Sequence, residues 1–169
     1  LIGLIEKVSL TWLDDHDLSV WKLNGLGFLV NWCSSNNLQS ILNQSLRYHS
    51  GALDQFISIT GEYNRQAWRA NPRGLVCHWL SGNVPLLGML TLVQSILTKN
   101  VNLIKVSSGN DKALPLLLES FRAVEYKTPG GYTIKGDDLL DTIAVIYYSS
   151  ADRKKAEAFS LAADVRLAW

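Results

Sequence analysis

The spacing of apolar residues along the chain changes near residue 70. Before that point, apolar positions recur at the three- and four-residue spacing of amphipathic helices. Two stripes carry the pattern: Leu38, Ile41, Leu42 and Leu46, and then Leu53, Phe56, Ile57 and Tyr63. Polar breaks at residues 34–37 and 49–51 supply N-cap candidates between the helices. Residues 1–70 are therefore predicted to form a helical N-terminal segment, which Pro72 ends because proline disfavours helix in the preceding residue.

From Gly74 onward, short apolar runs alternate with helical stretches, a pattern typical of a parallel sheet covered on both faces. The expected strands are Leu75 to Trp79, Val101 to Val106, Ile143 to Tyr148, and a fourth that opens at Val165. The expected helices are Pro85 to Leu97, a helix capped by Asp111 that contains Leu114 to Phe121, and Asp152 to Leu161, with a loop at Thr128 to Gly131. The sequence therefore predicts an α/β fold in which the helical segment precedes an incomplete Rossmann-like sheet over residues 71–169.

Composition and charge narrow the class of protein. The chain has 169 residues, 47% of them hydrophobic and 18% charged, which is typical of a packed globular domain. A formal net charge of +1 gives no broad attraction to nucleic acid or to an anionic membrane. The longest apolar stretch, Val84 to Leu97, is interrupted by polar residues and is short for a membrane span. Two cysteines and no basic signal region predict a cytoplasmic protein.

Both ends of the chain are unusual for a complete protein. It begins at Leu1 without a methionine, and it stops at Trp169 inside a strand-like run. We therefore expect it to be a piece of a longer protein.

Two loops follow the first two predicted strands, and parallel pairing would bring them to the same edge of the sheet. They are Leu80 to Asn83 and Lys105 to Ser108. Ligands of open parallel sheets bind beyond the carboxyl ends of the strands, so these loops form the expected binding site. Gly82 allows a backbone to approach a ligand closely, and Pro85 suits the first turn of a helix whose N-terminus favours negative charge.

Residues 74–85, GLVCHWLSGNVP, and residues 100–108, NVNLIKVSS, resemble the aldehyde dehydrogenase superfamily. Within it, SGNVP at 81–85 and ADVRLAW at 163–169 are similar to the LuxC-like fatty acyl-CoA reductases of bacterial bioluminescence. The second run is usually continued by a glycine pair that is missing here. The resemblance covers residues 74–169, and the helical front is compatible with it.

The resemblance implies roles for residues in both loops. Asn83 matches the asparagine whose amide helps hold the oxyanion of a thiohemiacetal, an interaction worth roughly 3 to 4 kcal/mol of barrier. Lys105 matches the lysine that contacts the adenosine ribose. The other cofactor-loop residues would be Leu80, Ser81, Gly82, Ser107 and Ser108. Read without the resemblance, Asn83 satisfies a strand-to-helix turn and Lys105 is a solvated surface lysine.

Ser108 bears on the choice of cofactor. It stands where NAD-preferring relatives often carry glutamate, so the carboxylate that would repel a 2′-phosphate is missing while Lys105 remains. The cofactor is therefore predicted to be NADPH rather than NADH.

The implied activity is NADPH-dependent reduction of a fatty acyl-CoA or acyl-protein to an aldehyde, through a cysteine thioester. The nucleophile would lie beyond Trp169, so the chain alone would be inactive. The resemblance also implies a homo-oligomer and partner subunits that activate or transfer the acyl group. Two alternatives stay open: an NAD-dependent aldehyde dehydrogenase, and a non-catalytic α/β scaffold or interaction domain.

Other chemistry-bearing residues carry weaker signals. Cys77 lies in the middle of an apolar strand and Cys33 among helical residues, so both are predicted to be inert core thiols. The histidines at positions 16, 49 and 78 match no metal motif, and no metal site is predicted. The six tryptophans are not interleaved with clustered basic residues, which argues against a nucleic-acid platform. Trp79 is of interest because its strand leads into the expected cofactor loop.

Overall fold

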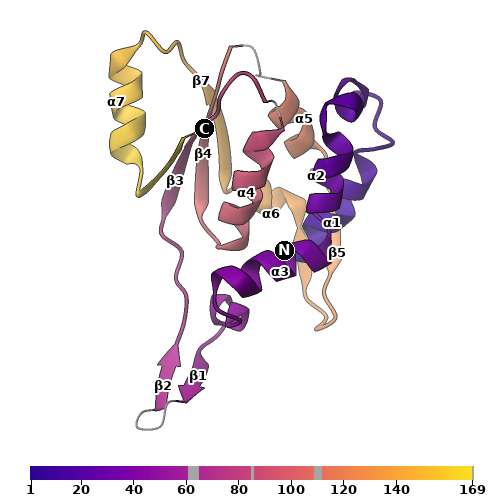
Figure 1. Ribbon diagram of the computed structural model, residues 1–169, viewed down its shortest axis with the longest axis vertical. Coiled ribbons are helices and arrows are strands. Elements are labelled where there is room, and N and C mark those ends of the chain that lie inside the picture. The colour runs from indigo at the N-terminus through magenta and orange to yellow at the C-terminus, as the bar shows by residue number, and fades with distance from the viewer. Residues whose placement is uncertain (61–64, 85, 109–111, 169) are drawn as a thin grey trace.

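A four-stranded parallel sheet lies at the centre of the computed structural model, which describes residues 1–60, 65–84, 86–108 and 112–168 (Figure 1). The strands are β1 (Ile57–Thr60), β2 (Arg65–Trp68), β3 (Leu75–Trp79), β4 (Val101–Val106), β5 (Glu125–Lys127), β6 (Thr133–Lys135), β7 (Ile143–Tyr147) and β8 (Val165–Ala168). The helices are α1 (Ile2–Thr11), α2 (Leu26–Trp32), α3 (Ser35–Ser45), α4 (Leu87–Leu97), α5 (Ala113–Glu119), α6 (Gly136–Leu140) and α7 (Arg153–Ala162), with 3-10 turns η1 (Ser19–Asn24) and η2 (Ser50–Leu53).

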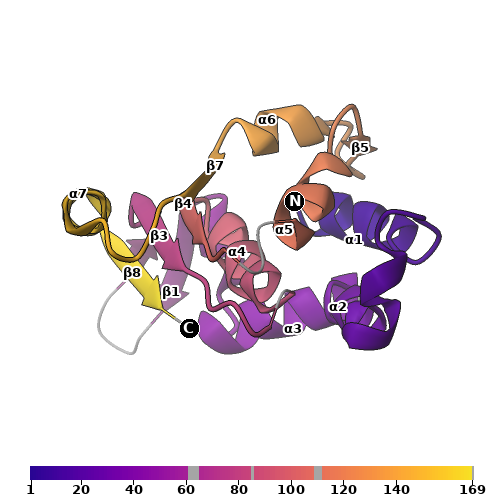
Figure 2. The ribbon, with the colours of Figure 1, turned by 90° about the horizontal axis from the view of Figure 1, so that it is seen from above.

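The central sheet has the strand order β7-β4-β3-β8, and all of its pairs are parallel. The chain moves outward from β3 to β4 and β7, and then returns to the opposite side of β3 as β8. The direction of winding therefore changes at β3, which is where open α/β sheets bind their ligands. Helix α7 covers one face of this sheet, and α4 and α5 cover the other (Figures 1 and 2). The predicted Rossmann-like α/β class is confirmed.

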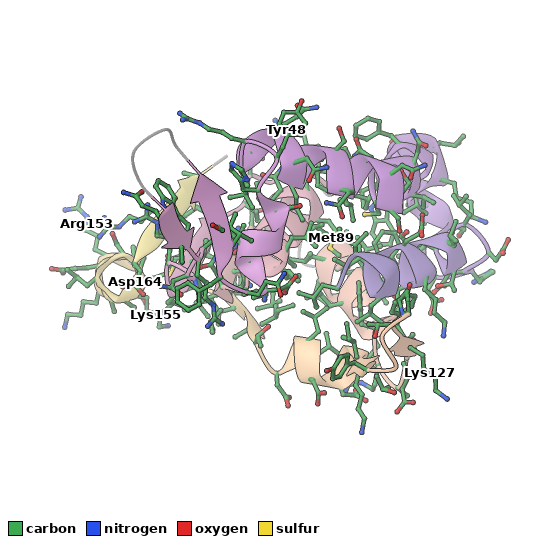
Figure 3. All side chains as sticks on the ribbon, turned by 90° about the horizontal axis from the view of Figure 1, so that it is seen from below. Tyr48, Met89, Lys127, Arg153, Lys155 and Asp164 are labelled. Atoms are coloured by element: carbon green, nitrogen blue, oxygen red, sulfur yellow. The ribbon has the colours of Figure 1, made fainter. Side chains whose placement is uncertain are left out.

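Helix α4 is buried from two sides, which explains why its sequence is apolar nearly all round. On one side lies the sheet, where Ile104 of β4 is 1% exposed. On the other side lie α1 to α3, and Figure 2 shows α4 between them and the sheet. Met89 of α4 is fully buried and lies near the middle of the molecule in Figure 3. The N-terminal helices and the sheet therefore share one hydrophobic core.

A second, smaller core lies under α7 on the opposite face of the sheet. Phe159 of α7 packs there with Cys77 of β3 and Tyr148, which follows β7. Outer residues of α7 are polar, and Arg153 and Lys155 project from it in Figure 3. Successive side chains of each strand point to opposite faces of the sheet and so pack into two different cores, as a sheet covered on both faces requires.

Most predicted elements after residue 74 are confirmed. Strands β3 and β4 have the predicted bounds, and β7 ends one residue earlier than predicted, at Tyr147. Asp152 caps α7 by accepting a hydrogen bond from the backbone N–H of Lys155 at 3.1 Å. The predicted loop at 128–131 joins β5 to β6. The capping role predicted for Asp111 and the role of Pro85 fall outside the described residues, as does Trp169.

The helical stripe predicted from Leu53 to Tyr63 is wrong. Residues 57–60 form strand β1, which pairs with β2 in an antiparallel hairpin from Ile57–Trp68 to Thr60–Arg65. Figure 1 shows this hairpin projecting from the body of the molecule. The run from Ile57 to Thr60 alternates β-branched and polar residues with a period of two, so its strand preference outweighs the helical spacing. Tyr63 lies outside the described residues.

Two side chains fix the start of β3 between its neighbours. The Asn100 amide oxygen accepts hydrogen bonds from the backbone N–H groups of Arg73 and Gly74, at 2.7 and 3.2 Å. On the other side, the Asp164 carboxylate accepts from the N–H of Leu75 at 2.8 Å. Gly74 has φ +116°, and a Cβ there would collide with Asp164, so this position requires glycine.

His78 forms a buried polar pair with Asn102 inside the sheet. Its Nε2 lies 3.1 Å from the Asn102 amide oxygen, and the Asn102 amide nitrogen donates to the carbonyl of Asn100 at 3.0 Å. The imidazole therefore donates through Nε2, and its buried Nδ1 has no partner among the described residues. Burial lowers the pKa of His78, against the opposing effect of the hydrogen bond with Asn102.

His78 is expected to make the stability of the fold depend on pH. Because the pKa of His78 is lower in the fold than the value of about 6.5 of an unfolded chain, the unfolded state binds more protons in this range. The stabilisation is therefore fully present above pH ~6.5 and is lost as the pH falls through the folded pKa. Denaturant unfolding should give a free energy of unfolding that decreases below pH ~6.5, and less steeply in His78→Gln. His16→Gln, at a fully exposed side chain, is the control and should keep the wild-type slope. A wild-type slope in His78→Gln would contradict this assignment.

Candidate functional site

The two loops predicted to form the site lie side by side at the carboxyl edge of the sheet. Trp79 at the end of β3 is the register partner of Lys105 in β4. Beyond this pair, the N–H of Leu80 donates to the carbonyl of Lys105 at 3.1 Å. A Cβ placed on Gly82 would lie 2.9 Å from the Ser107 hydroxyl oxygen, so the second loop touches the first. The parallel register thus brings Leu80, Gly82, Lys105 and Ser107 together.

The first loop is anchored on the start of α4. The half-buried side chain of Leu80 packs against Gly88 so closely that a Cβ on this glycine would collide with it. Ser81 is also half-buried, whereas Gly82 and Asn83 are exposed. Leu80 therefore fixes the loop by packing, and the polar residues after it face outward.

Asn83 lies in the bend that leads to α4. Its side chain is exposed. The N-cap of α4 is Leu86, and no side chain caps the helix there among the described residues. An amide in this bend can donate to a group bound at the loop, and the nearby helix N-terminus favours negative charge there.

The second loop carries a cation and two hydroxyl groups. Lys105 is half-buried, and its ammonium forms no ion pair within the described ranges. Its Nζ instead lies 5.6 Å from the ring centroid of Tyr148. The Ser107 hydroxyl is buried and has no hydrogen-bond partner among the described residues, while Ser108 is exposed in the turn. A cation without an acidic partner and an unpaired hydroxyl are groups suited to a ribose or a phosphate.

Tyr148 is the residue at this site that sequence reasoning missed, because the pattern marked it only as the end of a strand. Trp79, in contrast, is half-buried and packs against the smaller core. Its ring meets Phe159 of α7 at 4.4 Å between centroids, with the ring planes at 88°. Its indole therefore packs under α7 rather than presenting a face to the loops.

The two cysteines are buried in the cores, as predicted. Cys77 is 0% exposed, and burial raises its pKa, outweighing the opposing influence of Arg166. Burial raises the pKa of Cys33 to about 12. Neither thiol is ionised near neutral pH, so neither is a nucleophile in this fold.

Among the residues that the structure describes, no three side chains of His, Cys, Asp or Glu gather closely enough to hold a metal ion. No helix in the same residues has both the length and the apolar character needed to cross a membrane.

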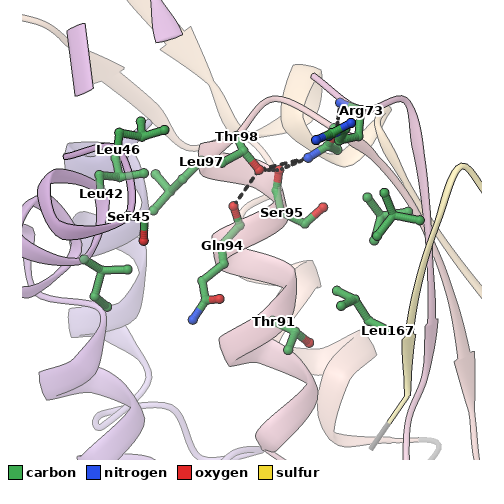
Figure 4. Close-up of a pocket in the computed structure, with 14 residues that line it drawn as sticks. Leu42, Ser45, Leu46, Arg73, Thr91, Gln94, Ser95, Leu97, Thr98 and Leu167 are labelled. Atoms are coloured by element: carbon green, nitrogen blue, oxygen red, sulfur yellow. Dashed lines mark hydrogen bonds between the residues drawn. The ribbon is translucent and has the colours of Figure 1, made fainter. Parts of the chain in front are cut away.

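A groove of about 390 Å³ lies elsewhere, between α3, α4 and β8 (Figure 4). Leu42 and Leu46 line it from α3, and Leu167 lines it from β8. Arg73 and Asn100 bound it at the amino-terminal end of β3 and β4. None of the residues predicted for the site lines this groove, and the amino-terminal end of a parallel sheet is not where such sheets bind ligands. The groove is therefore separate from the candidate site.

Comparison with known proteins places the chain in a family. The family model described as "Acyl-CoA reductase (LuxC)" matches residues 2–169. The chain belongs to the acyl-CoA reductase (LuxC) family. The match includes the helical front, where the sequence itself carried no clear resemblance.

Curated relatives of the chain are named long-chain acyl-protein thioester reductases. The chain is 32% identical over 146 residues to long-chain acyl-protein thioester reductase 2 of Photobacterium leiognathi, and 31% identical over 147 residues to long-chain acyl-protein thioester reductase of Aliivibrio fischeri. Each alignment covers 83% of this chain and 28% of the relative. This LuxC-family chain thus spans little more than a quarter of the length of these proteins.

A solved structure supports the fold. The glyceraldehyde-3-phosphate dehydrogenase GapN of Methanocaldococcus jannaschii, complexed with NADP, superposes with a TM-score of 0.53. The superposition covers 99% of this LuxC-family chain and 40% of GapN, at 12% sequence identity. At this identity the likeness concerns the fold alone, and it agrees with the aldehyde dehydrogenase-like architecture predicted from the sequence.

The contact between Gly82 and Ser107 can be tested by substitution. In Gly82→Ala, the new Cβ must displace the Ser107 hydroxyl, and we expect a loss of about 1 kcal/mol in the free energy of unfolding. Gly82→Ala combined with Ser107→Ala should recover it, because the Ser107 Cβ would lie 3.5 Å from the new methyl group. Denaturant titration measures both. Gly27→Ala, with nothing within 4 Å, is the matched control and should not destabilise the chain. If the double variant is no more stable than Gly82→Ala alone, the loops do not meet as described.

Proposed function

We propose that the longer protein containing this chain reduces a long-chain acyl thioester to an aldehyde with a nicotinamide cofactor. Curated relatives are named long-chain acyl-protein thioester reductases, and the family is described as acyl-CoA reductase. The observation that carries the proposal is the contact between the two loops at the carboxyl edge of β3 and β4. That contact brings to one edge of the sheet an exposed amide, a hydroxyl without a hydrogen-bond partner among the described residues, and a lysine without an acidic partner among them.

The donor set fits a nicotinamide dinucleotide. Lys105 would approach the adenosine ribose, and the hydroxyls of Ser107 and Ser108 would bond ribose or phosphate oxygens. The buried Ser107 hydroxyl, which has no partner in the described part of the chain, supports this role, because a buried donor without a partner costs free energy unless a ligand satisfies it. When bound, the cofactor would supply the hydride.

We propose NADPH as the preferred cofactor. Two features of the second loop support this proposal: the half-buried Lys105 has no acidic partner among the described residues, and Ser108 carries no negative charge. A 2′-phosphate would therefore meet a cation and no carboxylate from this loop. GapN, which shares the fold, is complexed with NADP.

Asn83 would stabilise the charge that develops at the acyl carbonyl oxygen. In the proposed reaction, the acyl group is held as a thioester on a cysteine outside this chain. Reduction of the thioester carbon breaks the carbon–sulfur bond, and the thiolate leaves as the aldehyde forms. While the carbon is tetrahedral, its oxygen is negative and the exposed Asn83 amide would donate a hydrogen bond to it. The chain would thus contribute a catalytic donor and part of the cofactor site, and would not turn over alone.

An acyl-protein or acyl-CoA is the proposed substrate. The names of the relatives favour a protein-bound acyl group as the form delivered to the enzyme. Self-association and a subunit that activates or transfers the acyl group stay predictions from the family resemblance.

The role of Asn83 predicts a kinetic defect. Asn83→Ala in the full-length protein should lower kcat for acyl-thioester reduction by about 100-fold, with KM for the cofactor nearly unchanged. Asn36→Ala, an exposed asparagine on α3, is the matched control and should retain wild-type kcat. Steady-state oxidation of NADPH with an acyl-CoA substrate measures both. A wild-type kcat in Asn83→Ala would remove this residue from the mechanism, and exclusive NAD-dependent aldehyde oxidation by the wild type would overturn the proposed reaction.

The cofactor preference predicts that substitutions at two positions of the second loop both weaken NADPH binding relative to NADH binding. Lys105→Ala should weaken binding of NADPH to the full-length protein about tenfold and binding of NADH less, because only NADPH carries the 2′-phosphate. Ser108→Glu should lower the affinity for NADPH relative to NADH, since it adds a carboxylate to this loop. Fluorescence titration with each cofactor measures the dissociation constants. Lys22→Ala, at an exposed lysine, is the control. Equal losses for both cofactors in Lys105→Ala would argue against 2′-phosphate recognition.

A further inference from the structure

The ammonium of Lys105 lies over an aromatic ring from a different part of the sheet. Its Nζ is 5.6 Å from the ring centroid of Tyr148, which directly follows β7, the strand next to β4. Tyr148 is 5% exposed, whereas the adjacent Tyr147 is 59% exposed. A cation at this distance from a ring face is attracted by the ring quadrupole, and the attraction increases where water is excluded.

The ring under Lys105 is held in place by two further aromatic side chains. Tyr148 packs against Phe159 of α7 at 5.9 Å between centroids, with the planes tilted by 60°. Phe159 in turn meets the ring of Trp79 edge-on at 4.4 Å. Trp79 lies directly beside Lys105 in the sheet, as its register partner in β3. The three aromatic rings and Lys105 therefore form one local group. We call Trp79, Tyr148 and Phe159 the aromatic platform.

The aromatic platform fixes the lysine without neutralising it. A carboxylate in place of the ring would also hold the ammonium, but it would cancel most of the positive charge presented to a ligand. In the described ranges, the lysines that form ion pairs are Lys99, with Asp54, and Lys155, with Asp152. Lys105 is not among them. Its flexible side chain is therefore restricted by a neutral surface, which lowers the conformational entropy lost when an anion binds.

We propose that Tyr148 is a positioning residue that holds Lys105 for the 2′-phosphate of NADPH, an inference that rests on the cofactor site proposed above. The ring carries this role, and the hydroxyl does not. The Tyr148 hydroxyl is buried and has no partner among the described residues, so a ligand outside the fold does not reach it. The face of the ring is what Lys105 contacts.

Four variants of the full-length protein test the ring against the hydroxyl. Tyr148→Leu removes the ring and should weaken NADPH binding about fivefold, with a smaller effect on NADH. Tyr148→Phe keeps the ring and should retain wild-type affinity for both cofactors. Tyr147→Leu is the matched control at the exposed neighbour and should bind both cofactors as the wild type does. Lys105→Ala combined with Tyr148→Leu should bind NADPH no more weakly than Lys105→Ala alone, because Tyr148 acts through the lysine.

The outcomes separate this inference from the proposed function. If Lys105→Ala leaves NADPH binding unchanged, the cofactor site itself is wrong. If Lys105→Ala weakens NADPH binding but Tyr148→Leu does not, only the role of Tyr148 is overturned. If Tyr148→Leu weakens binding equally in the presence and absence of the Lys105 side chain, the effect comes from the fold, and the positioning role is also overturned.

A second measurement does not depend on the folding of Tyr148→Leu. Phenylalanine analogues with increasing numbers of ring fluorines, incorporated at position 148, keep the shape of the ring while withdrawing electron density from its face. The affinity for NADPH should fall stepwise as fluorines are added, because the quadrupole that attracts the ammonium weakens. The affinity for NADH should change less. A constant NADPH affinity across the series would overturn the positioning role.

Discussion

The central position of β3, with β4 on one side and β8 on the other, is the constraint on which the site depends. Asn100 and Asp164 fix the start of this strand by accepting hydrogen bonds from backbone N–H groups of residues 73–75. Because successive residues in a parallel pair advance together, fixing the starts of β3 and β4 also fixes where both strands end. The loops after these strands then meet in one register, with the Leu80 N–H on the Lys105 carbonyl.

Both faces of the sheet act on the second loop, in different ways. Toward α4, Ile104 and Val106 of β4 are buried in the larger core, which holds the backbone of the strand in place. Toward α7, Lys105 leaves the opposite face and meets Tyr148. Side chains of β4 point alternately to the two faces of the sheet. Ile104 and Val106 therefore support the strand from one face, while Lys105, on the other face, would contact the ligand.

The sequence predicted best those elements whose apolar patterns are unambiguous. Strand β3 is a short apolar run that begins after Gly74, and β4 lies between Asn100 and Ser107; the bounds of both strands were predicted correctly. Strand β1 was missed because residues 57–60 are a short alternating run. Apolar residues in and around this run also fit the spacing of a helix, and that longer pattern favoured the wrong prediction. The pairing of His78 with Asn102 was equally out of reach, since it depends on side chains from two strands that face the same side of the sheet.

For the site itself, local pattern located the loops, and the parallel-sheet rule predicted that they would be neighbours. The sequence could not show that Ser107 touches Gly82 or that Lys105 lies over Tyr148. Both contacts depend on the register between strands and, for Tyr148, on the path of the chain through α5, β5, β6 and α6 before it returns as β7. Such contacts arise from tertiary packing, which a periodicity along one segment does not encode.

The double burial of α4 has a consequence for how proteins of this kind can be recombined. Asn83 lies just before this helix, and the helix is wedged between the sheet and α1 to α3 (Figure 2). The placement of the amide relative to the sheet therefore depends on side chains of the first forty-five residues, which are distant from it in sequence. A chimera that exchanges this N-terminal segment between two relatives would replace the helices that pack against one side of α4. Such an exchange would shift the position of Asn83 relative to the sheet while leaving every residue of the two loops unchanged.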